Sequence, residues 1–216
     1  MSLDYTVKPG EVIFTFIGDD PSNTKIFSSA YSDTEPLYTV HQELQHSHGY
    51  HKATVIQKAS EPGAPPHVLA TIQYRNLSGD RIAFDAEAKT SPITVEKYLH
   101  GKLTHYEYVT PSSPSRSSAL IILVRELAFE DEHGKKYQWH GDHPHIPKLY
   151  IAGDLSTPIA ELHSRGQNPD HPKQYDSKSI LVLAPAAVEI QDQVVVSFLW
   201  ILNRTQSWLA AQVNLS

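Results

Sequence analysis

Hydrophobic residues in the first two thirds of the chain recur in short segments separated by turn-forming residues. Segments 11–17 (EVIFTFI), 67–75 (HVLATIQYR) and 80–86 (DRIAFDA) have the length and the β-branched and aromatic content typical of strands. Clusters such as GDDPSNT and SEPGAPP lie between strand-like segments and favour turns. Up to KSILVLA (178–184), the pattern predicts about 12 mostly antiparallel strands.

The segment PAAVEIQDQVVVSFLWILNR (185–204) breaks this pattern and predicts a helix. Pro185 suits the first helical position, and Asp192 and Arg204 complement the helix dipole near the two ends. Residues 194–202 contain only Ser197 as a weakly polar side chain, so apolar side chains point in every direction around the helix. A helix that is apolar all round is buried on all sides, which predicts a core helix near 187–203.

Two alternatives for this segment have less support. A membrane-spanning helix needs roughly 20 apolar residues, whereas this run has nine between Asp192 and Asn203. Its valines also suit a strand, because β-branched side chains favour strands. The length of the segment, the placement of its charges and Pro185 favour the helix.

Short strands and one all-apolar helix together predict a mainly β protein. The interior of a barrel must be filled, and a helix can fill it. We therefore predict a closed antiparallel β-barrel around a central hydrophobic C-terminal helix. The stretch 110–118 (TPSSPSRSS) is rich in Ser and Pro and is followed at once by a strand-like segment, so we interpret it as a loop within a single domain, 1–216.

The order of segments resembles an uncharacterised basidiomycete fungal family, a domain of unknown function. The similar segments are FTFIGDDPSNTKIFSS, LATIQYRNLSGDRIAFDA, RELAFEDEHGKKYQWHG, LYIAGDLSTPIAELHSRG and PAAVEIQDQVVVSFLWILNR, and the last two are the most telling. The resemblance implies a barrel that is similar to Tubby-like, LURP-one-like and scramblase-like proteins. It implies no catalytic residues, and membrane-surface or phosphoinositide binding enters only by analogy of fold.

Composition and charge narrow the range of possible functions. The formal net charge of −6 disfavours a nucleic-acid binder, because phosphate contacts need a basic surface. The absence of Cys excludes disulfides, thiolate metal sites and a Cys nucleophile. The N-terminal residues lack a cationic region followed by an apolar segment, so we expect no signal peptide and a cytoplasmic location.

The 13 His residues are numerous and clustered, in HQELQHSHGYH and in EDEHGKKYQWHGDHPH. Neutral imidazole is a ligand for Zn and Cu, and alternate residues of an extended segment share a face. The candidate metal ligands are His140, His143, His145, His46 and His48. The simpler interpretation is that these are solvent-exposed loop residues. The resembling family is not His-rich after the segment similar to Tyr137–Trp139, so such a site would be peculiar to this protein.

Clustered cations are the feature that anionic lipid head groups require. The candidates are Lys97, Lys102, Arg125, Lys135, Lys136 and Arg165, although a solvated face explains them equally simply. No G-x-S-x-G, P-loop or dinucleotide-binding motif is present. We therefore expect a non-enzymatic binding or scaffold module without a cofactor, whose partner is an anionic lipid or a protein. The alternative is a His-rich metal-binding protein or metal-dependent hydrolase. The oligomeric state stays open.

Overall fold

The computed structural model describes residues 5–32, 34–45, 51–75, 79–84, 92–109, 118–141, 147–163 and 180–213. Within these ranges the chain forms thirteen strands and three helices. The strands are β1 Val12–Asp20, β2 Asn23–Ser28, β3 Tyr38–Gln45, β4 His51–Lys58, β5 His67–Gln73, β6 Arg81–Phe84, β7 Ile93–Thr94, β8 His100–Val109, β9 Ser118–Glu130, β10 Lys136–His140, β11 Lys148–Ile151, β12 Ala160–His163 and β13 Ile180–Leu183. The helices are α1 Val95–Tyr98, α2 Pro185–Val188 and α3 Gln191–Val213.

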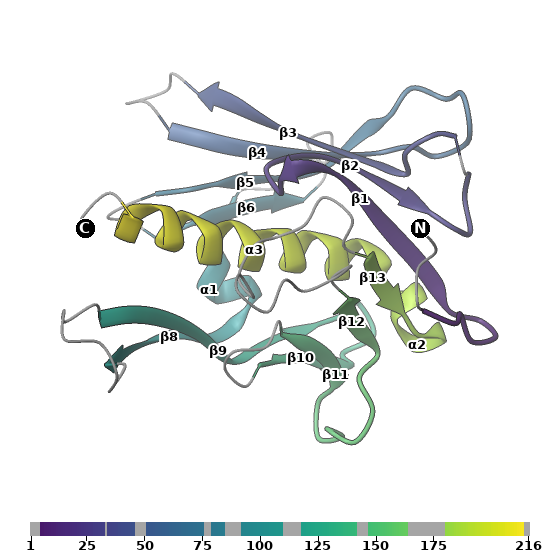
Figure 1. Cartoon of the computed structure of the whole chain (residues 1–216). Coiled ribbons are helices and arrows are strands. Elements are labelled where there is room, and N and C mark those ends of the chain that lie inside the picture. The colour runs from purple at the N-terminus through teal and green to yellow at the C-terminus, as the bar shows by residue number, and fades with distance from the viewer. Residues whose placement is uncertain are drawn as a thin grey trace.

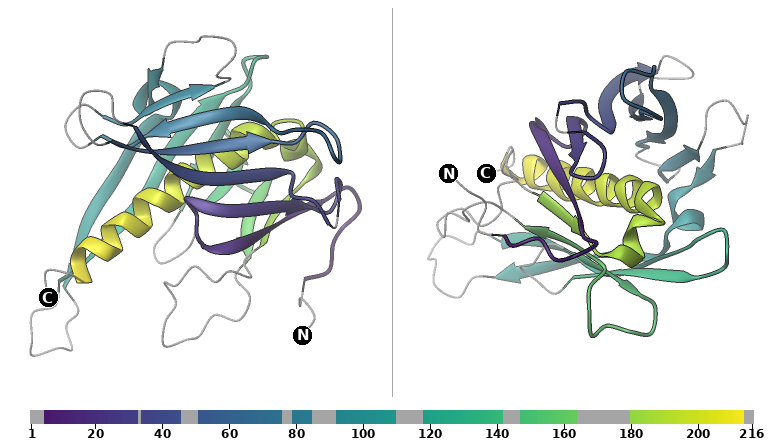
Figure 2. Two further views of the ribbon diagram at one scale, coloured as in Figure 1. Left: turned by 90° about the horizontal axis from the view of Figure 1, so that it is seen from above. Right: turned by 90° about the vertical axis from the view of Figure 1, so that its right-hand side faces the viewer.

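All thirteen strands belong to one sheet with antiparallel neighbours. The order is β7-β6-β5-β4-β3-β2-β1-β13-β12-β11-β10-β9-β8. The first and last strands of the chain pair with each other, Val12 opposite Leu183 and Phe14 opposite Leu181. The sheet therefore curves so that its two halves lie on either side of α3 (Figure 1), and two further views show the same arrangement (Figure 2).

The predicted closed barrel is not confirmed, because the described residues contain no pairing between β7 and β8, the two ends of the sheet. The chain leaves β7 after two residues and forms α1, in which the Leu99 N–H donates to the Val95 carbonyl at 2.6 Å. Helical backbone cannot continue a strand ladder, so the hydrogen-bonded wall ends here.

Aromatic side chains bridge this gap in place of backbone hydrogen bonds. The rings of Phe84 (β6) and Tyr98 (α1) lie 4.9 Å apart, and Tyr98 lies 6.1 Å from Phe129 (β9). Phe129 in turn stacks on Tyr137 (β10) at 5.4 Å. Such ring pairs contribute roughly 0.5–1.5 kcal/mol each beyond their burial. The two edges of the sheet are thus connected by α1 and by packing.

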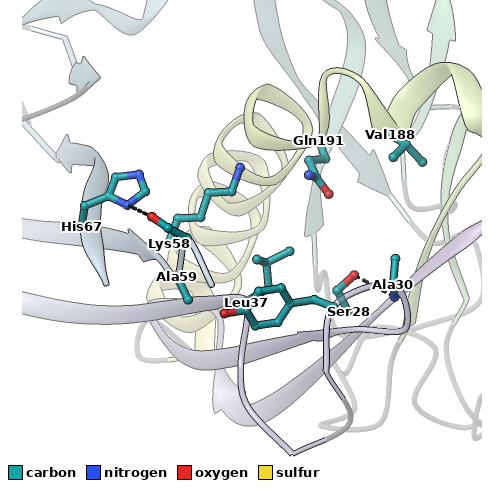
Figure 3. A pocket seen from close by; sticks show the side chains of 10 residues that line it. Ser28, Ala30, Leu37, Lys58, Ala59, His67, Val188 and Gln191 are labelled. Carbon is teal, nitrogen blue, oxygen red and sulfur yellow. Dashed lines mark hydrogen bonds between the residues drawn. The ribbon is translucent and has the colours of Figure 1, made fainter. Parts of the chain in front are cut away.

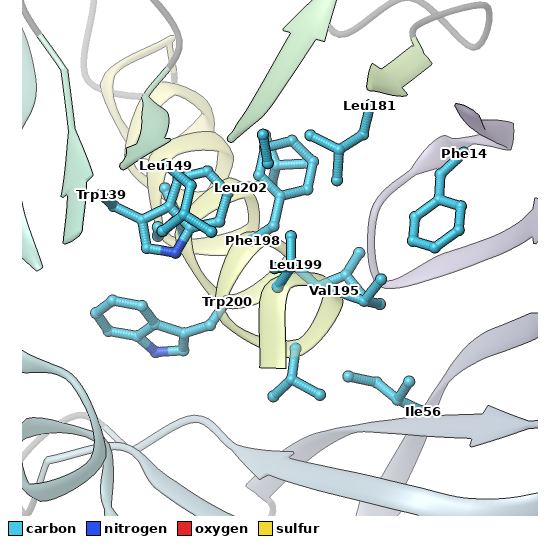
Figure 4. Packing of buried hydrophobic residues seen from close by; sticks show 14 of the residues in the cluster. Phe14, Ile56, Trp139, Leu149, Leu181, Val195, Phe198, Leu199, Trp200 and Leu202 are labelled. Atoms are coloured by element: carbon cyan, nitrogen blue, oxygen red, sulfur yellow. The ribbon is translucent and has the colours of Figure 1, made fainter. Parts of the chain in front are cut away.

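The prediction that residues 194–202 form a helix buried on all sides is confirmed. Every one of these residues is buried, and Ser197 is completely inaccessible. Side chains from both halves of the sheet surround the helix, among them Phe14, Ile56, Trp139, Leu149 and Leu181 (Figure 4). No helix within the described ranges is long and apolar enough to cross a membrane.

The predicted boundaries of this helix differ from the observed ones. Pro185 does start a helix, but α2 ends at Val188, and α3 begins at Gln191. The short α2 turns the chain from β13 into the interior and buries Ala187 at the turn. At the other end, α3 runs past Arg204 to Val213. Arg204 lies within the helix because its guanidinium pairs with a buried carboxylate of the sheet, Asp80, and does not cap the last turn.

Polar contacts fix the position of α3 along its axis. The indole N–H of Trp139 donates to Ser197 Oγ at 2.9 Å, and Ser197 Oγ donates to the Gln193 carbonyl at 2.6 Å. The Ser22 hydroxyl also donates a hydrogen bond to Asn203, directly after the buried residues 194–202 of α3. Apolar packing is non-directional, so these bonds select one axial position among many of similar burial.

Candidate functional site: a pocket where α3 enters the sheet

A pocket of about 390 Å³ opens where α2 and α3 enter the sheet. Two loops that are distant in sequence, after β2 and after β4, meet the start of α3 there (Figure 3). Its polar lining consists of Ser28, Tyr31, Lys58, Ser60, His67 and Gln191. Its apolar lining consists of Ala30, Leu37, Ala59 and Val188. We call this the helix-entry pocket; its volume lies in the range of small-molecule sites.

Backbone hydrogen bonds hold the two loops of the helix-entry pocket together. The Ala59 N–H donates to the Leu37 carbonyl at 2.9 Å, and the Gly63 N–H donates to Glu35 Oε2 at 2.8 Å. Gly63 has a φ of +79°, which residues with a side chain rarely adopt. The turn-forming sequence 60–66 thus shapes one wall of the pocket.

Lys58 is the one lysine or arginine of the lining, and it is paired. Its Nζ lies 2.8 Å from Asp192, in the first turn of α3, and 5.9 Å from the centre of the Tyr38 ring. Tyr38 donates its hydroxyl to Asp192 Oδ1 at 2.6 Å. Burial and the Asp192 carboxylate raise the pKa of Tyr38 far above its usual value, so this hydroxyl remains a donor. The Lys58–Asp192 pair makes the inner wall nearly neutral.

Tyr31 supplies a hydroxyl with no partner. The oxygen is buried, yet it has no hydrogen bond within the described part of the chain. Burial raises the pKa of Tyr31, and the neighbouring carboxylates of Glu35 and Glu61 raise it further. This hydroxyl is therefore an unsatisfied polar group of a residue that lines the pocket.

Ser60 and His67 lie side by side in the lining. Ser60 Oγ and His67 Nδ1 are 3.4 Å apart, and both residues are exposed. In the described ranges, no carboxylate hydrogen-bonds the other ring nitrogen of His67. The arrangement offers hydrogen-bond donors and acceptors to a ligand.

A sequence profile identifies the family. The Family of unknown function (DUF6593) matches residues 19–207, which is most of the chain. The chain belongs to this family. No curated protein and no solved structure matches the chain. The matched range of this DUF6593 protein includes all ten residues of the helix-entry pocket and all of the core helix from Gln191 to Arg204.

In the DUF6593 protein a second polar cluster, around Asp80, lies at the C-terminal end of the buried stretch of α3. This carboxylate accepts hydrogen bonds from Trp200 Nε1 at 2.8 Å and from Arg204 Nε at 2.6 Å. The backbone N–H of Arg75 also donates to it, at 3.0 Å. Asp80 is only 4% exposed, and each of its oxygens already has partners, so this cluster anchors the helix.

The structure describes one of the five predicted metal ligands. His140 ends β10, and its buried Nδ1 has no hydrogen-bond partner among the described residues. His46, His48, His143 and His145 lie outside the described residues. Within the described ranges, no three His, Asp or Glu side chains are grouped as a metal site requires. The candidate metal site therefore stays a prediction.

The predicted lipid-binding cations are distributed over several elements. Lys97 is exposed on α1 beside Glu96. Lys135 lies over the Tyr137 ring at 5.4 Å, and Lys136 lies 4.0 Å from Glu130. Lys102 and Arg125 are placed by their backbone alone, in β8 and β9, and Arg165 lies outside the described residues. Lys135 thus has an aromatic ring nearby and Lys136 a carboxylate, and these neighbours compete with a phosphate for the two ammonium groups.

The helix-entry pocket is not evident in the sequence pattern. SEPGAPP indicates only a turn, Asp192 indicates only a complement to the helix dipole, and nothing in the pattern distinguishes Tyr31, Lys58 or Gln191. The pocket joins residues separated by more than a hundred positions. The available signal in the sequence is the number of polar residues in the two loops. Surface loops in general are rich in polar residues, so this signal does not distinguish a pocket.

Proposed function

We propose that this DUF6593 protein is a non-enzymatic, cytoplasmic binding or scaffold module that takes its ligand in the helix-entry pocket. The observation that carries the proposal is the pocket itself, a cavity of about 390 Å³ with six polar residues around it. Its strongest charges are already paired, and its Ser–His contact is long and exposed. These features support binding without chemistry.

The same proposal includes the finer assignment of the fold as a Tubby-like barrel. The burial of residues 194–202 of α3 on all sides and the aromatic contacts from Phe84 to Tyr137 support it. The membrane-surface partner suggested by that analogy has less support, because Lys135 and Lys136 neighbour Glu130, Asp131 and Glu132. The basidiomycete origin stays a prediction.

The test is to map small-molecule binding by backbone chemical shifts. A fragment library with neutral, anionic and cationic members is titrated into the ¹⁵N-labelled full chain, and spectra of the bound fragments are followed for a day. We expect shifts at 28–37, 58–67 and 188–191, and fragments that are recovered unchanged. Binding only elsewhere, or conversion of a fragment, contradicts the proposal.

A pocket-filling variant, Ala59→Trp, should remove these shifts because the indole occupies the cavity. Leu155→Trp is the matched control, since Leu155 is 49% exposed and lies outside the pocket. Thermal unfolding checks that both variants fold, and Ala30→Leu replaces Ala59→Trp if the latter does not. Sedimentation with vesicles of phosphatidylcholine and phosphatidylserine tests the lipid interpretation; binding unaffected by pocket filling would assign function to another surface.

A second candidate function is metal binding, with Zn or Cu as the metal, in a storage role or in a hydrolase. One observation favours it: the buried, unpartnered Nδ1 of His140 at the end of β10. A ligating imidazole uses one ring nitrogen for the metal and donates from the other to a second group.

Elemental analysis of tag-free protein tests this second function directly. A bound metal at one equivalent, lost in His140→Ala, supports it. Metal-free protein that takes up neither Zn nor Cu on titration eliminates it. Lys97→Ala, an exposed cation on α1, is the control and should leave metal content unchanged.

A further inference from the structure

We propose that the helix-entry pocket binds an uncharged, polyhydroxylated ligand such as a sugar ring. This inference deepens the proposed function, because it names the chemical class of the ligand and rests on the same pocket. Three properties of the lining carry it: its charge balance, its hydrogen-bonding groups and its apolar surface.

The charges around the pocket disfavour ligands of either sign. Lys58 is neutralised by Asp192 at 2.8 Å, so it offers an anion little net attraction. Glu35 and Glu61 lie near Tyr31, and their charges repel an anion from that side. The paired Lys58 and Asp192 likewise offer a cation little net attraction. An uncharged ligand depends on neither charge.

The hydrogen-bonding groups match hydroxyls. Ser28, Ser60 and Tyr31 carry hydroxyls, and Gln191 carries an amide, so each of these side chains can both donate and accept. Each hydroxyl of a sugar also does both. The Tyr31 oxygen is covered by neighbouring atoms and has no hydrogen bond in the described part of the protein, so a ligand hydroxyl that displaces this cover would supply the missing partner.

The remaining lining is apolar and interspersed with the polar groups. Ala30, Leu37, Ala59 and Val188 contribute alkyl surface from both loops and from α2. A sugar ring presents C–H groups between its hydroxyls, so it can cover such a mixed surface without burying unpaired polar atoms. A purely polar ion cannot use this alkyl surface.

The experiment measures dissociation constants by chemical-shift titration at constant ionic strength. The probes are glucose, mannose, galactose and N-acetylglucosamine, followed by glucose 6-phosphate and glucosamine as charged counterparts of glucose. We expect at least one neutral sugar to bind in the pocket. We also expect glucose 6-phosphate and glucosamine each to bind about tenfold more weakly than glucose. If glucose does not bind, the reference is the neutral sugar with the lowest dissociation constant.

Tyr31→Phe is the decisive variant. It removes a hydroxyl with no intramolecular partner, so the free protein should keep or gain thermal stability. Sugar binding should nevertheless weaken about tenfold, the equivalent of losing one hydrogen bond of roughly 1.4 kcal/mol. Tyr98→Phe is the matched control, since its hydroxyl is also buried and unpartnered but lies in α1.

Each outcome decides between the two proposals. Tighter binding of glucose 6-phosphate, or unchanged sugar affinity in Tyr31→Phe, overturns the sugar inference. Fragments that bind in the pocket while no sugar does also overturn it, but they leave the binding-module proposal intact. A pocket that binds neither sugars nor fragments removes both.

Discussion

The two ends of the buried stretch of the core helix are both held by a carboxylate, but in opposite arrangements. At the start of α3, Asp192 belongs to the helix and accepts hydrogen bonds from Tyr38 and Lys58 of the sheet. At the other end, Asp80 belongs to the sheet side and accepts hydrogen bonds from Trp200 and Arg204 of the helix.

The two clusters differ most in their exposure to solvent. The Asp192 and Lys58 side chains are 32% and 22% exposed, whereas the Asp80 side chain is 3% exposed. Water screens the first pair, so it contributes little to stability and can serve a ligand site. The second carboxylate has lost its hydration, so its protein partners must replace it. The start of α3 is thus the solvent-accessible end, beside the proposed ligand site (the proposed binding end), and the Asp80 cluster is the anchoring end.

Removing the anchoring carboxylate should have the largest effect. Asp80→Ala leaves Arg204 and the Trp200 indole without their acceptor. Removing one member of a buried pair costs about 3–5 kcal/mol. Urea unfolding of the variant should show this loss in the free energy of unfolding. Asp80→Asn, which keeps one carbonyl acceptor, is the control and should lose less. A loss below about 1 kcal/mol in Asp80→Ala would contradict the anchoring role.

A variant in the middle of the helix should lose an amount of stability between the losses at the two ends. Ser197→Ala deprives the buried Trp139 indole of its acceptor, 2.9 Å away. An unsatisfied buried donor costs about 1–3 kcal/mol. The double variant Trp139→Phe with Ser197→Ala removes both partners. The double variant should lose less free energy of unfolding than the two single variants lose together. Simple additivity of the two losses would show that the bond contributes little.

At the binding end, we expect a smaller loss for Tyr38→Phe. This change removes the hydroxyl that donates to Asp192 and keeps the buried ring against Phe14. The loss should be about 1 kcal/mol, because Asp192 retains Lys58 and partial access to water. Chemical denaturation measures it. A loss equal to that of Asp80→Ala would remove the distinction between the two ends.

Salt should have the smallest effect and should act on one end only. Raising salt from about 0.01 M to about 1 M shortens the Debye length from ~30 to ~3 Å. A double-mutant cycle of Lys58→Met and Asp192→Asn should give a coupling of at most about 1 kcal/mol that shrinks with salt. The equivalent cycle of Asp80→Asn and Arg204→Met should change little. Equal salt dependence at both ends would contradict the difference in exposure.

Much of the fold could be predicted because it depends on local pattern. The strands β1, β5, β6 and β13 overlap the predicted segments 11–17, 67–75, 80–86 and 178–184, and Pro185 starts a helix as predicted. The break between Val188 and Gln191 could not be predicted. The break depends on where β13 ends relative to the protein interior. After Pro185, no residue up to 191 is a helix breaker that would indicate it in the sequence.

The open edge of the sheet was also beyond sequence reasoning. Closure between β7 and β8 depends on whether two strands that are consecutive in the chain can meet after the sheet has curved around α3. The distance between β7 and β8 after this curving cannot be predicted from the residues of α1 alone. The candidate pocket has the same origin, since Tyr31, Lys58 and Gln191 become neighbours only through the pairing of β2, β3 and β4 around the helix.

The sequence by itself determined that residues 194–202 must be enclosed, because their apolar side chains leave no face for water. Hydrophobic burial requires only that the surface be covered and has no directional preference. The tertiary structure decided which groups would hold the helix in place, with Asp80 deeply buried at one end and Asp192 beside a pocket at the other. Hydrogen bonds need specific distances and angles, and only the folded chain brings such distant residues to those positions.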